Sequence, residues 1–184
     1  MMAKRCSWVT NDPLYINYHD NEWGYPQYDS LKLFEKICLE GQQAGLSWIT
    51  VLKKREEYRR CFFNFDPEKI IQLNAIDIES LIKNKGLIRN RLKLNSIVKN
   101  AYAYLAMQNN NEDFSQFIWS FVDGKPIVNH YKDKSEVPVS TEISNKMSKA
   151  LKKKGFSFVG STICYAFMQS MGLVNDHFED CFKK

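Results

Sequence analysis

The chain has 184 residues, of which 44% are hydrophobic and 26% are charged, with 8 glycines and 5 prolines. This composition excludes disordered and fibrous proteins, and the length suits a single globular domain spanning residues 1–184. The net charge of +5 identifies no partner unless the basic residues gather on one face. No segment resembles a membrane span or a secretory signal, so we expect a cytoplasmic protein without membrane contact.

Helical periodicity dominates the chain after residue 30. Capping residues and apolar spacing predict helices over residues 30–41, 46–58, from 66, 77–86, 90–108, 113–121, 140–153 and 160–171. Ser30 is the expected N-cap of the first of these, and Ser140 opens the seventh. Residues 123–140 are polar and predict a surface loop or a boundary. Because no segment shows sustained strand alternation, we predict an all-α domain, with residues 1–30 and the C-terminal tail packed against its body.

The two ends of the chain each carry one cysteine and one histidine. Cys6 and His19 lie 13 positions apart near the N-terminus, and His177 and Cys181 lie one helical turn apart near the C-terminus. A set of two cysteines and two histidines closes a tetrahedral zinc shell, and such a zinc is structural because no position remains for water. The spacing leaves a second interpretation open, in which the four are unrelated core or surface residues.

Aromatic residues are concentrated between positions 8 and 28: Trp8, Tyr15, Tyr18, Trp23, Tyr25 and Tyr28. Such a cluster can stack a flat ligand, and its electron-rich faces attract a cation. Packing is the alternative, most of all for Tyr25 and Tyr28. Glu40 and Trp48 flank a turn rich in small residues and can point into the same cleft, although a lone glutamate at a helix end is usually a solvated charge.

Residues 80–111 contain no aspartate or glutamate. The basic residues of this stretch are Lys83, Lys85, Arg89, Arg91, Lys93 and Lys99. Several of them gather around Gly86, where a short helix gives way to a longer one over about residues 77–108. This pattern resembles the helix-hairpin-helix element that grips DNA phosphates without reading sequence. A solvated helix face is the alternative interpretation.

Several ordered motifs together resemble the 3-methyladenine DNA glycosylase I family of bacteria. They are Cys6-Ser7-Trp8, Asp12 to Tyr15, Tyr18 to Gly24, Glu40 with Gln43 to Trp48, residues 152–167 and Asn175-Asp176-His177. The resemblance covers nearly the whole chain. It implies an all-α helix-hairpin-helix glycosylase in which one structural zinc, held by the four cysteines and histidines named above, joins residues 1–30 to residues 172–184.

The resemblance also implies roles for individual residues. Glu40 is the expected catalytic residue, because it hydrogen-bonds the flipped base, with Tyr18 assisting. Trp48 stacks on the base, and the remaining pocket walls are Trp8, Tyr15 and Trp23. Leu46 fills the gap left by the extruded nucleotide, with Gln43 beside it. The expected contacts to the DNA backbone are Lys85, Arg89, Arg91 and Lys93.

The implied activity is hydrolytic removal of 3-methyladenine from alkylated double-stranded DNA, leaving an abasic site without strand cleavage. Methylation at N3 makes the base cationic, so it departs as a neutral group and needs no general acid. The absence of any acid between Glu79 and Glu112 agrees with this. We expect a monomer that works in the bacterial cytosol at the nucleoid, with no obligatory protein partner. The alternative is a non-enzymatic, zinc-stabilised nucleic-acid-binding protein, which would leave the aromatic cluster without a role.

Overall fold

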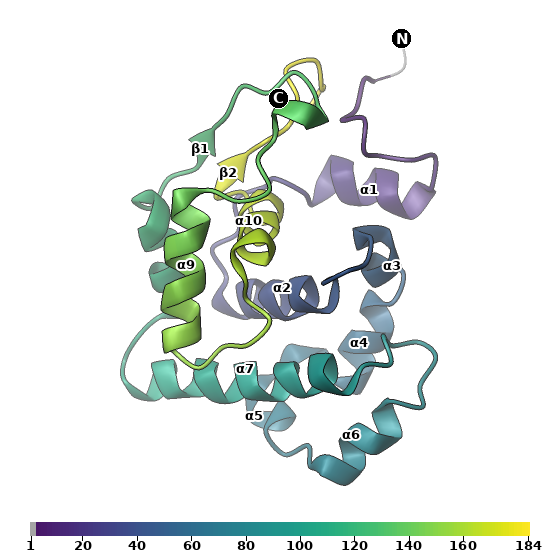
Figure 1. Cartoon of the computed structure of the whole chain (residues 1–184), viewed down its shortest axis with the longest axis vertical. Helices are drawn as coiled ribbons and strands as arrows, with labels where there is room; N and C mark the ends of the chain where they lie inside the picture. Colours follow the sequence, from purple (N-terminus) through teal and green to yellow (C-terminus); the bar gives the residue numbers. More distant parts are fainter. Residues whose placement is uncertain (1–2) are drawn as a thin grey trace.

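The structure, a computed structural model, describes residues 3–184, and its regular secondary structure is mostly helical (Figure 1). The α-helices are α1 (Pro13–Asn21), α2 (Ser30–Gln42), α3 (Trp48–Leu52), α4 (Arg55–Cys61), α5 (Pro67–Ile70), α6 (Ala75–Leu81), α7 (Arg91–Asn109), α8 (Phe114–Trp119), α9 (Glu142–Lys153) and α10 (Ser161–Ser170). Short 3₁₀ turns are η1 (Phe63–Phe65), η2 (Ser120–Val122) and η3 (Lys134–Glu136). None of these described helices combines the length and hydropathy needed to cross a membrane.

Helix α2 lies at the centre of the molecule and packs against α7 and α10 (Figure 1). Phe34, Ile37 and Cys38 are fully buried, as their helical spacing predicts, whereas Leu31 of the same predicted face is 50% exposed. The helix begins one residue earlier than the predicted cap would place it, because the Asp29 side chain accepts the hydrogen bond from the Lys32 amide. The end of α2 is therefore fixed inside the protein, and this end carries Glu40.

The long helix α7 and the short helix α5 begin where the sequence predicts. Asn90 caps α7, and Asp66 caps α5 with Pro67 at its first position. The single helix predicted over residues 46–58 is wrong, because the chain turns at Lys53 and Lys54 and forms α3 and α4 instead. This turn lets both helices bury an apolar face, since Val51 and Tyr58 are fully enclosed.

Three other boundaries differ from the prediction. Asn74, rather than Asp77, caps α6 through a capping box, and the helix ends at Leu81, well before Gly86. Thr141, rather than Ser140, caps α9. Helix α1 was not predicted separately, although Asp12 followed by proline is a start signal of the same kind as the one before α5.

Residues 123–140 form a loop that runs beside the C-terminal segment. Within it β1 (Ile127–Val128) pairs in parallel with β2 (Val174–Asn175), with Ile127 opposite Val174 and Val128 opposite Asn175. These two-residue strands were not predicted, because strand alternation is recognisable only over a longer run.

The N-terminal and C-terminal segments contact each other as well as the body, which confirms the predicted packing. The Phe182 amide donates to the Lys4 carbonyl at 2.9 Å. The Gly24 amide donates to the Ser170 carbonyl at 3.2 Å, so the N-terminal segment is also bound to the end of α10.

We predict that Gly172→Ala destabilises the fold more than Gly124→Ala. Both glycines have φ of +74°, where a side chain is strained. A Cβ at Gly172 would lie 2.4 Å from the Pro26 nitrogen, whereas a Cβ at Gly124 would meet nothing within 4 Å. Urea unfolding should therefore show a loss of about 1 kcal/mol for Gly124→Ala from backbone strain alone, and a larger loss for Gly172→Ala. Equal losses would show that the close approach at Gly172 is relieved without cost.

Candidate active site and metal cluster

A cavity of about 500 Å³ opens between the ends of α1, α2, α3 and α10 and is covered on one side by the loop that follows β1. The residues predicted as pocket walls converge on it from separate helices and loops. Its lining is Trp8, Tyr15, Tyr18, Trp23, Glu40, Gln43, Trp48, Lys134, Val137, Pro138, Val139, Thr162, Tyr165, Ala166, Gln169, Asp176 and Phe178. The cavity thus combines an aromatic wall with one glutamate and one aspartate.

Glu40 occupies the last turn of α2 and is 3% exposed. Its Oε1 lies 3.4 Å from the Nζ of Lys36, one helical turn earlier. Its Oε2 is buried and has no hydrogen-bond partner. Burial raises the pKa of the Glu40 carboxyl, and Lys36 opposes that rise. An unpartnered buried acceptor of this kind is costly and is satisfied when a ligand donates to it.

The aromatic rings form a continuous surface around this carboxylate. The Tyr18 ring lies 5.6 Å from that of Trp48 and 6.5 Å from that of Tyr15, and Trp8 is 5.1 Å from Tyr15. Trp48 is 8% exposed, and its indole nitrogen has no hydrogen-bond partner. The arrangement suits a flat ring that bears hydrogen-bonding groups.

Tyr25 and Tyr28 do not line the cavity, as their interpretation as packing residues predicts. Tyr28 stacks on Trp119 with ring centroids 4.3 Å apart. The Tyr25 hydroxyl donates to the Asp20 carbonyl.

Two buried polar residues in or beside the cavity wall were not predicted from the sequence. Asp176 is 1% exposed and accepts hydrogen bonds from Tyr165, Asn129 and Gln169. The sequence indicates Asp176 only through its position directly before His177. Its hydrogen-bond partners come from distant segments of the chain, so its burial could not be predicted. Lys36 was missed because a lysine on a helix normally marks a solvated face, and here it is 6% exposed.

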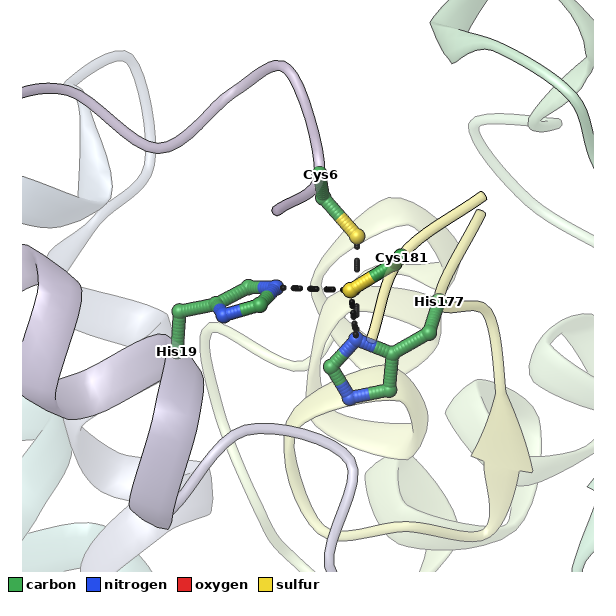
Figure 2. Close-up of side chains that lie close together, drawn as sticks. All are labelled: Cys6, His19, His177 and Cys181. Carbon is green, nitrogen blue, oxygen red and sulfur yellow. Dashed lines mark hydrogen bonds between the residues drawn. The ribbon is translucent and has the colours of Figure 1, made fainter. Parts of the chain in front are cut away.

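The structure brings Cys6, His19, His177 and Cys181 together in one buried cluster (Figure 2). Cys6 comes from the N-terminal segment, His19 from α1, and the other two from the segment after β2. The Cys181 Sγ lies 3.5 Å from His19 Nε2 and 3.6 Å from His177 Nδ1, and the Cys6 Sγ lies 3.6 Å from that same His177 nitrogen. A tetrahedral zinc with ordinary bond lengths has sulfur-to-nitrogen edges of about 3.6 Å, so the donor set fits one zinc ion.

The groups around the cluster orient its histidines for metal binding. His19 Nδ1 is 2.7 Å from Asp20, whose carboxylate is held by Arg5, and His177 Nε2 is 3.2 Å from the Trp23 carbonyl. Each ring therefore presents its other nitrogen to the centre. Burial lowers the pKa of His177 to about 4 and raises the pKa of the Cys6 thiol to about 12. The imidazole is thus neutral, and a thiolate at Cys6 requires a bound cation.

The cluster and the cavity share a wall. The Trp23 ring lines the cavity and packs edge-on against His177, with centroids 4.7 Å apart. Gly24 makes this contact possible, because a Cβ there would lie 2.9 Å from His177 Nε2. A displacement of His177 would therefore alter the packing of Trp23, which is part of the cavity wall.

The predicted DNA-contacting residues fall into two groups. Lys85, Arg89 and Arg91 are exposed in the loop between α6 and α7 or at the start of α7, and Arg91 pairs with Glu79 at 2.7 Å. Lys93 does not lie on that surface. It is 7% exposed, and its ammonium donates to the carbonyls of Gln42 and Ala44.

Lys93 therefore holds the turn between α2 and α3, a role that its position in a basic stretch did not indicate. This turn carries the two other residues predicted to reach DNA. Leu46 is 41% exposed at its tip, and Gln43 lines the cavity. The turn and the loop between α6 and α7 lie on the same side of the molecule (Figure 1).

A cavity with an aromatic wall and a buried carboxylate, set in a helical fold that also carries an exposed basic loop, is typical of an enzyme that takes up a nucleobase. The sequence profile of the methyladenine glycosylase family matches residues 8–184. The chain belongs to this family, which confirms the family predicted from the sequence.

The chain is 64% identical over 180 residues to a DNA-3-methyladenine glycosylase of Haemophilus influenzae, covering 98% of this chain and 97% of that protein. It superposes on a crystal structure of 3-methyladenine DNA glycosylase I with a TM-score of 0.96 at 60% identity, covering 97% of this chain and 98% of the other. A structure from Staphylococcus aureus, described as the basis of 3-methyladenine recognition, matches with a TM-score of 0.94 at 42% identity, over 98% and 96% of the two chains. These relatives favour the glycosylase over the non-enzymatic alternative.

We predict that Lys93→Met destabilises the protein while Lys99→Met does not. Both lysines lie on α7, but Lys99 is exposed. Loss of the Lys93 ammonium leaves the Gln42 and Ala44 carbonyls without their donor, at a cost of about 1–3 kcal/mol. Urea unfolding of both variants measures the difference, and an unchanged midpoint for Lys93→Met would contradict the role assigned to this lysine.

Proposed function

We propose that the protein is a DNA repair glycosylase that takes 3-methyladenine out of alkylated duplex DNA and hydrolyses its glycosidic bond, leaving an abasic site. The observation that carries the proposal is the unpartnered Oε2 of Glu40, buried in an aromatic cavity. An exocyclic amino group is the kind of donor that this oxygen lacks. Family membership and the close relatives support the same reaction.

The cavity selects the base by charge and shape. A base methylated at N3 is cationic before it is released, and the unpartnered Oε2 of Glu40 and the ring faces that line the cavity attract a cation. An unmodified adenine is neutral and lacks this attraction. Trp8, Tyr15 and Trp23 complete the wall, so the flipped base lies against aromatic rings.

The reaction needs no protein acid, because the cationic base leaves as a neutral molecule. Asp176, the other carboxylate of the cavity, is occupied by hydrogen bonds from Tyr165, Asn129 and Gln169. Lys36 does not line the cavity, and Lys134 reaches it from an exposed 3₁₀ turn where it is solvated. We therefore expect hydrolysis without a Schiff base and without strand cleavage.

The proposed DNA-binding surface consists of the turn after α2 and the predicted helix-hairpin-helix element. Leu46 fills the space of the flipped nucleotide, and Gln43 contacts its surroundings from the cavity edge. Lys85, Arg89 and Arg91 bind phosphates next to the damaged base. The protein acts on the nucleoid in the bacterial cytoplasm, as a monomer.

A single structural zinc held by Cys6, His19, His177 and Cys181 completes the proposal. The proposal is supported by the donor types, by their spacing and by the hydrogen bonds of the two histidines to Asp20 and to the Trp23 carbonyl. Because all four positions of the ion are filled by protein, the zinc would join the two ends of the chain and take no part in hydrolysis.

We predict that Glu40→Gln lowers the release of 3-methyladenine from methylated DNA by about 10-fold to 100-fold. The amide keeps the size of the side chain but loses a charge-assisted hydrogen bond worth about 1.5–3 kcal/mol. Chromatography of the released bases measures the effect. Glu35→Gln is the control, because Glu35 lies on the same helix but accepts from Arg59, and it should retain full activity. Normal release by Glu40→Gln would rule out the assigned role.

We predict that the purified protein contains one zinc per chain and that Cys181→Ser lacks it. Elemental analysis measures the metal, and thermal unfolding of wild type with and without a strong chelator should show a lower midpoint after zinc removal. Cys61→Ser is the matched control, since Cys61 lies outside the cluster, and it should keep the metal. A wild-type protein without zinc, or a Cys181→Ser variant with full zinc, would contradict the proposal.

A further inference from the structure

Lys36 is a buried lysine directly beside the proposed base-binding carboxylate. Its side chain is 7% exposed, and its ammonium lies 3.4 Å from Glu40 Oε1. The ammonium also donates to the Tyr18 hydroxyl at 2.7 Å and lies 3.5 Å from the centre of the Trp48 ring. Lys36 thus contacts three residues of the cavity wall without lining the cavity itself.

These contacts give the two oxygens of the Glu40 carboxylate different surroundings. Oε1 faces the ammonium, and Oε2 has no partner. A carboxylate without a nearby cation could rotate and would be favoured in its neutral form at this depth, because burial penalises charge. The ammonium is itself stabilised by the Tyr18 oxygen and by the face of Trp48.

We propose that Lys36 is a positioning residue that keeps the Glu40 carboxylate ionised and turned so that Oε2 remains available to the base. The inference rests on the proposed function, since it concerns the same pocket. Lys36 acts through Glu40 and does not touch the base. The opposed effects of burial and pairing on the pKa of Glu40 agree with this role.

Other charged and titratable groups also surround the pair. From the elements packed around it these are Tyr15, Tyr18 and Glu22 on or after α1, Arg55 on α4, Lys134 on η3, Tyr165 on α10, and Asp176 after β2. Glu22 is paired with Arg55 at 2.6 Å. Asp176 is held by its three hydrogen-bond donors. Lys36 is therefore the cation that directly balances Glu40.

The test compares Lys36→Met with wild type in binding free 3-methyladenine between about pH 5.5 and 7.5. Burial lowers the pKa of Lys36 to about 8, so the wild-type ammonium stays mostly charged over this range. The readout is the ratio of the two dissociation constants at each pH, measured by tryptophan fluorescence, so that titration of the ligand itself cancels. Without the ammonium the pKa of Glu40 rises further, and its charged form is lost at a higher pH. The ratio should be near 1 at the alkaline end and should increase to about tenfold at the acidic end, which corresponds to a shift of about one pKa unit.

The same pair of proteins is then compared in a Glu40→Gln background. Because Lys36 acts through the charge of Glu40, the ratio should be independent of pH and near 1 there. A ratio that is constant across pH in the first pair, or that persists in the Glu40→Gln background, would show that Lys36 only supports the fold and would overturn the inference.

Two further variants serve as controls, one that keeps the positive charge at position 36 and one that removes an exposed lysine from the same helix. Lys36→Arg keeps the cation and should keep the wild-type pH profile, which tests the inference even if Lys36→Met fails to fold. Lys32→Met, an exposed lysine on the same helix, should have no effect. Absence of 3-methyladenine binding by wild type would overturn the proposed function itself, whereas wild-type binding with an unchanged Lys36→Met profile would overturn the role of Lys36 alone.

Discussion

The site depends on one constraint, a glutamate carboxylate buried at the end of the central helix with an oxygen that the protein leaves unpaired. Helix α2 can carry Glu40 to this depth because its apolar residues fix it between α7 and α10. Lys36 offsets part of the cost of the buried charge, and aromatic rings surround the carboxylate. The remaining unsatisfied acceptor makes the pocket complementary to a ligand that brings both a donor and positive charge.

The ends of the chain hold this pocket in shape. Cys6 and His19 meet His177 and Cys181 in a buried cluster, and Trp23 belongs to the surroundings of both cluster and cavity. A metal bound there would fix the aromatic wall without taking part in the chemistry. Lys93 of α7 holds the turn that follows Glu40. The end of α2 that carries Glu40 is thus attached directly to α7.

Much of this was predictable from sequence because it depends on local signals. Caps such as Asn90 and Asp66 identify helix starts, and the cluster of tryptophans and tyrosines identified the walls that the structure brings together. The sequence did not indicate burial where it depends on distant partners. In the sequence Lys93 resembles a phosphate-binding residue, but in the structure it donates to a carbonyl at the end of α2. Lys36 resembles a surface lysine, but in the structure it is buried against Trp48 and Tyr18.

The decisive measurement is a crystal structure of the protein with 3-methyladenine. We expect the base in the aromatic cavity, with its amino group within hydrogen-bonding distance of Glu40 Oε2 and with Lys36 still beside Oε1. A base bound elsewhere, or one that contacts Oε1 while Oε2 remains unpaired, would show that Oε2 is not the acceptor that binds the base.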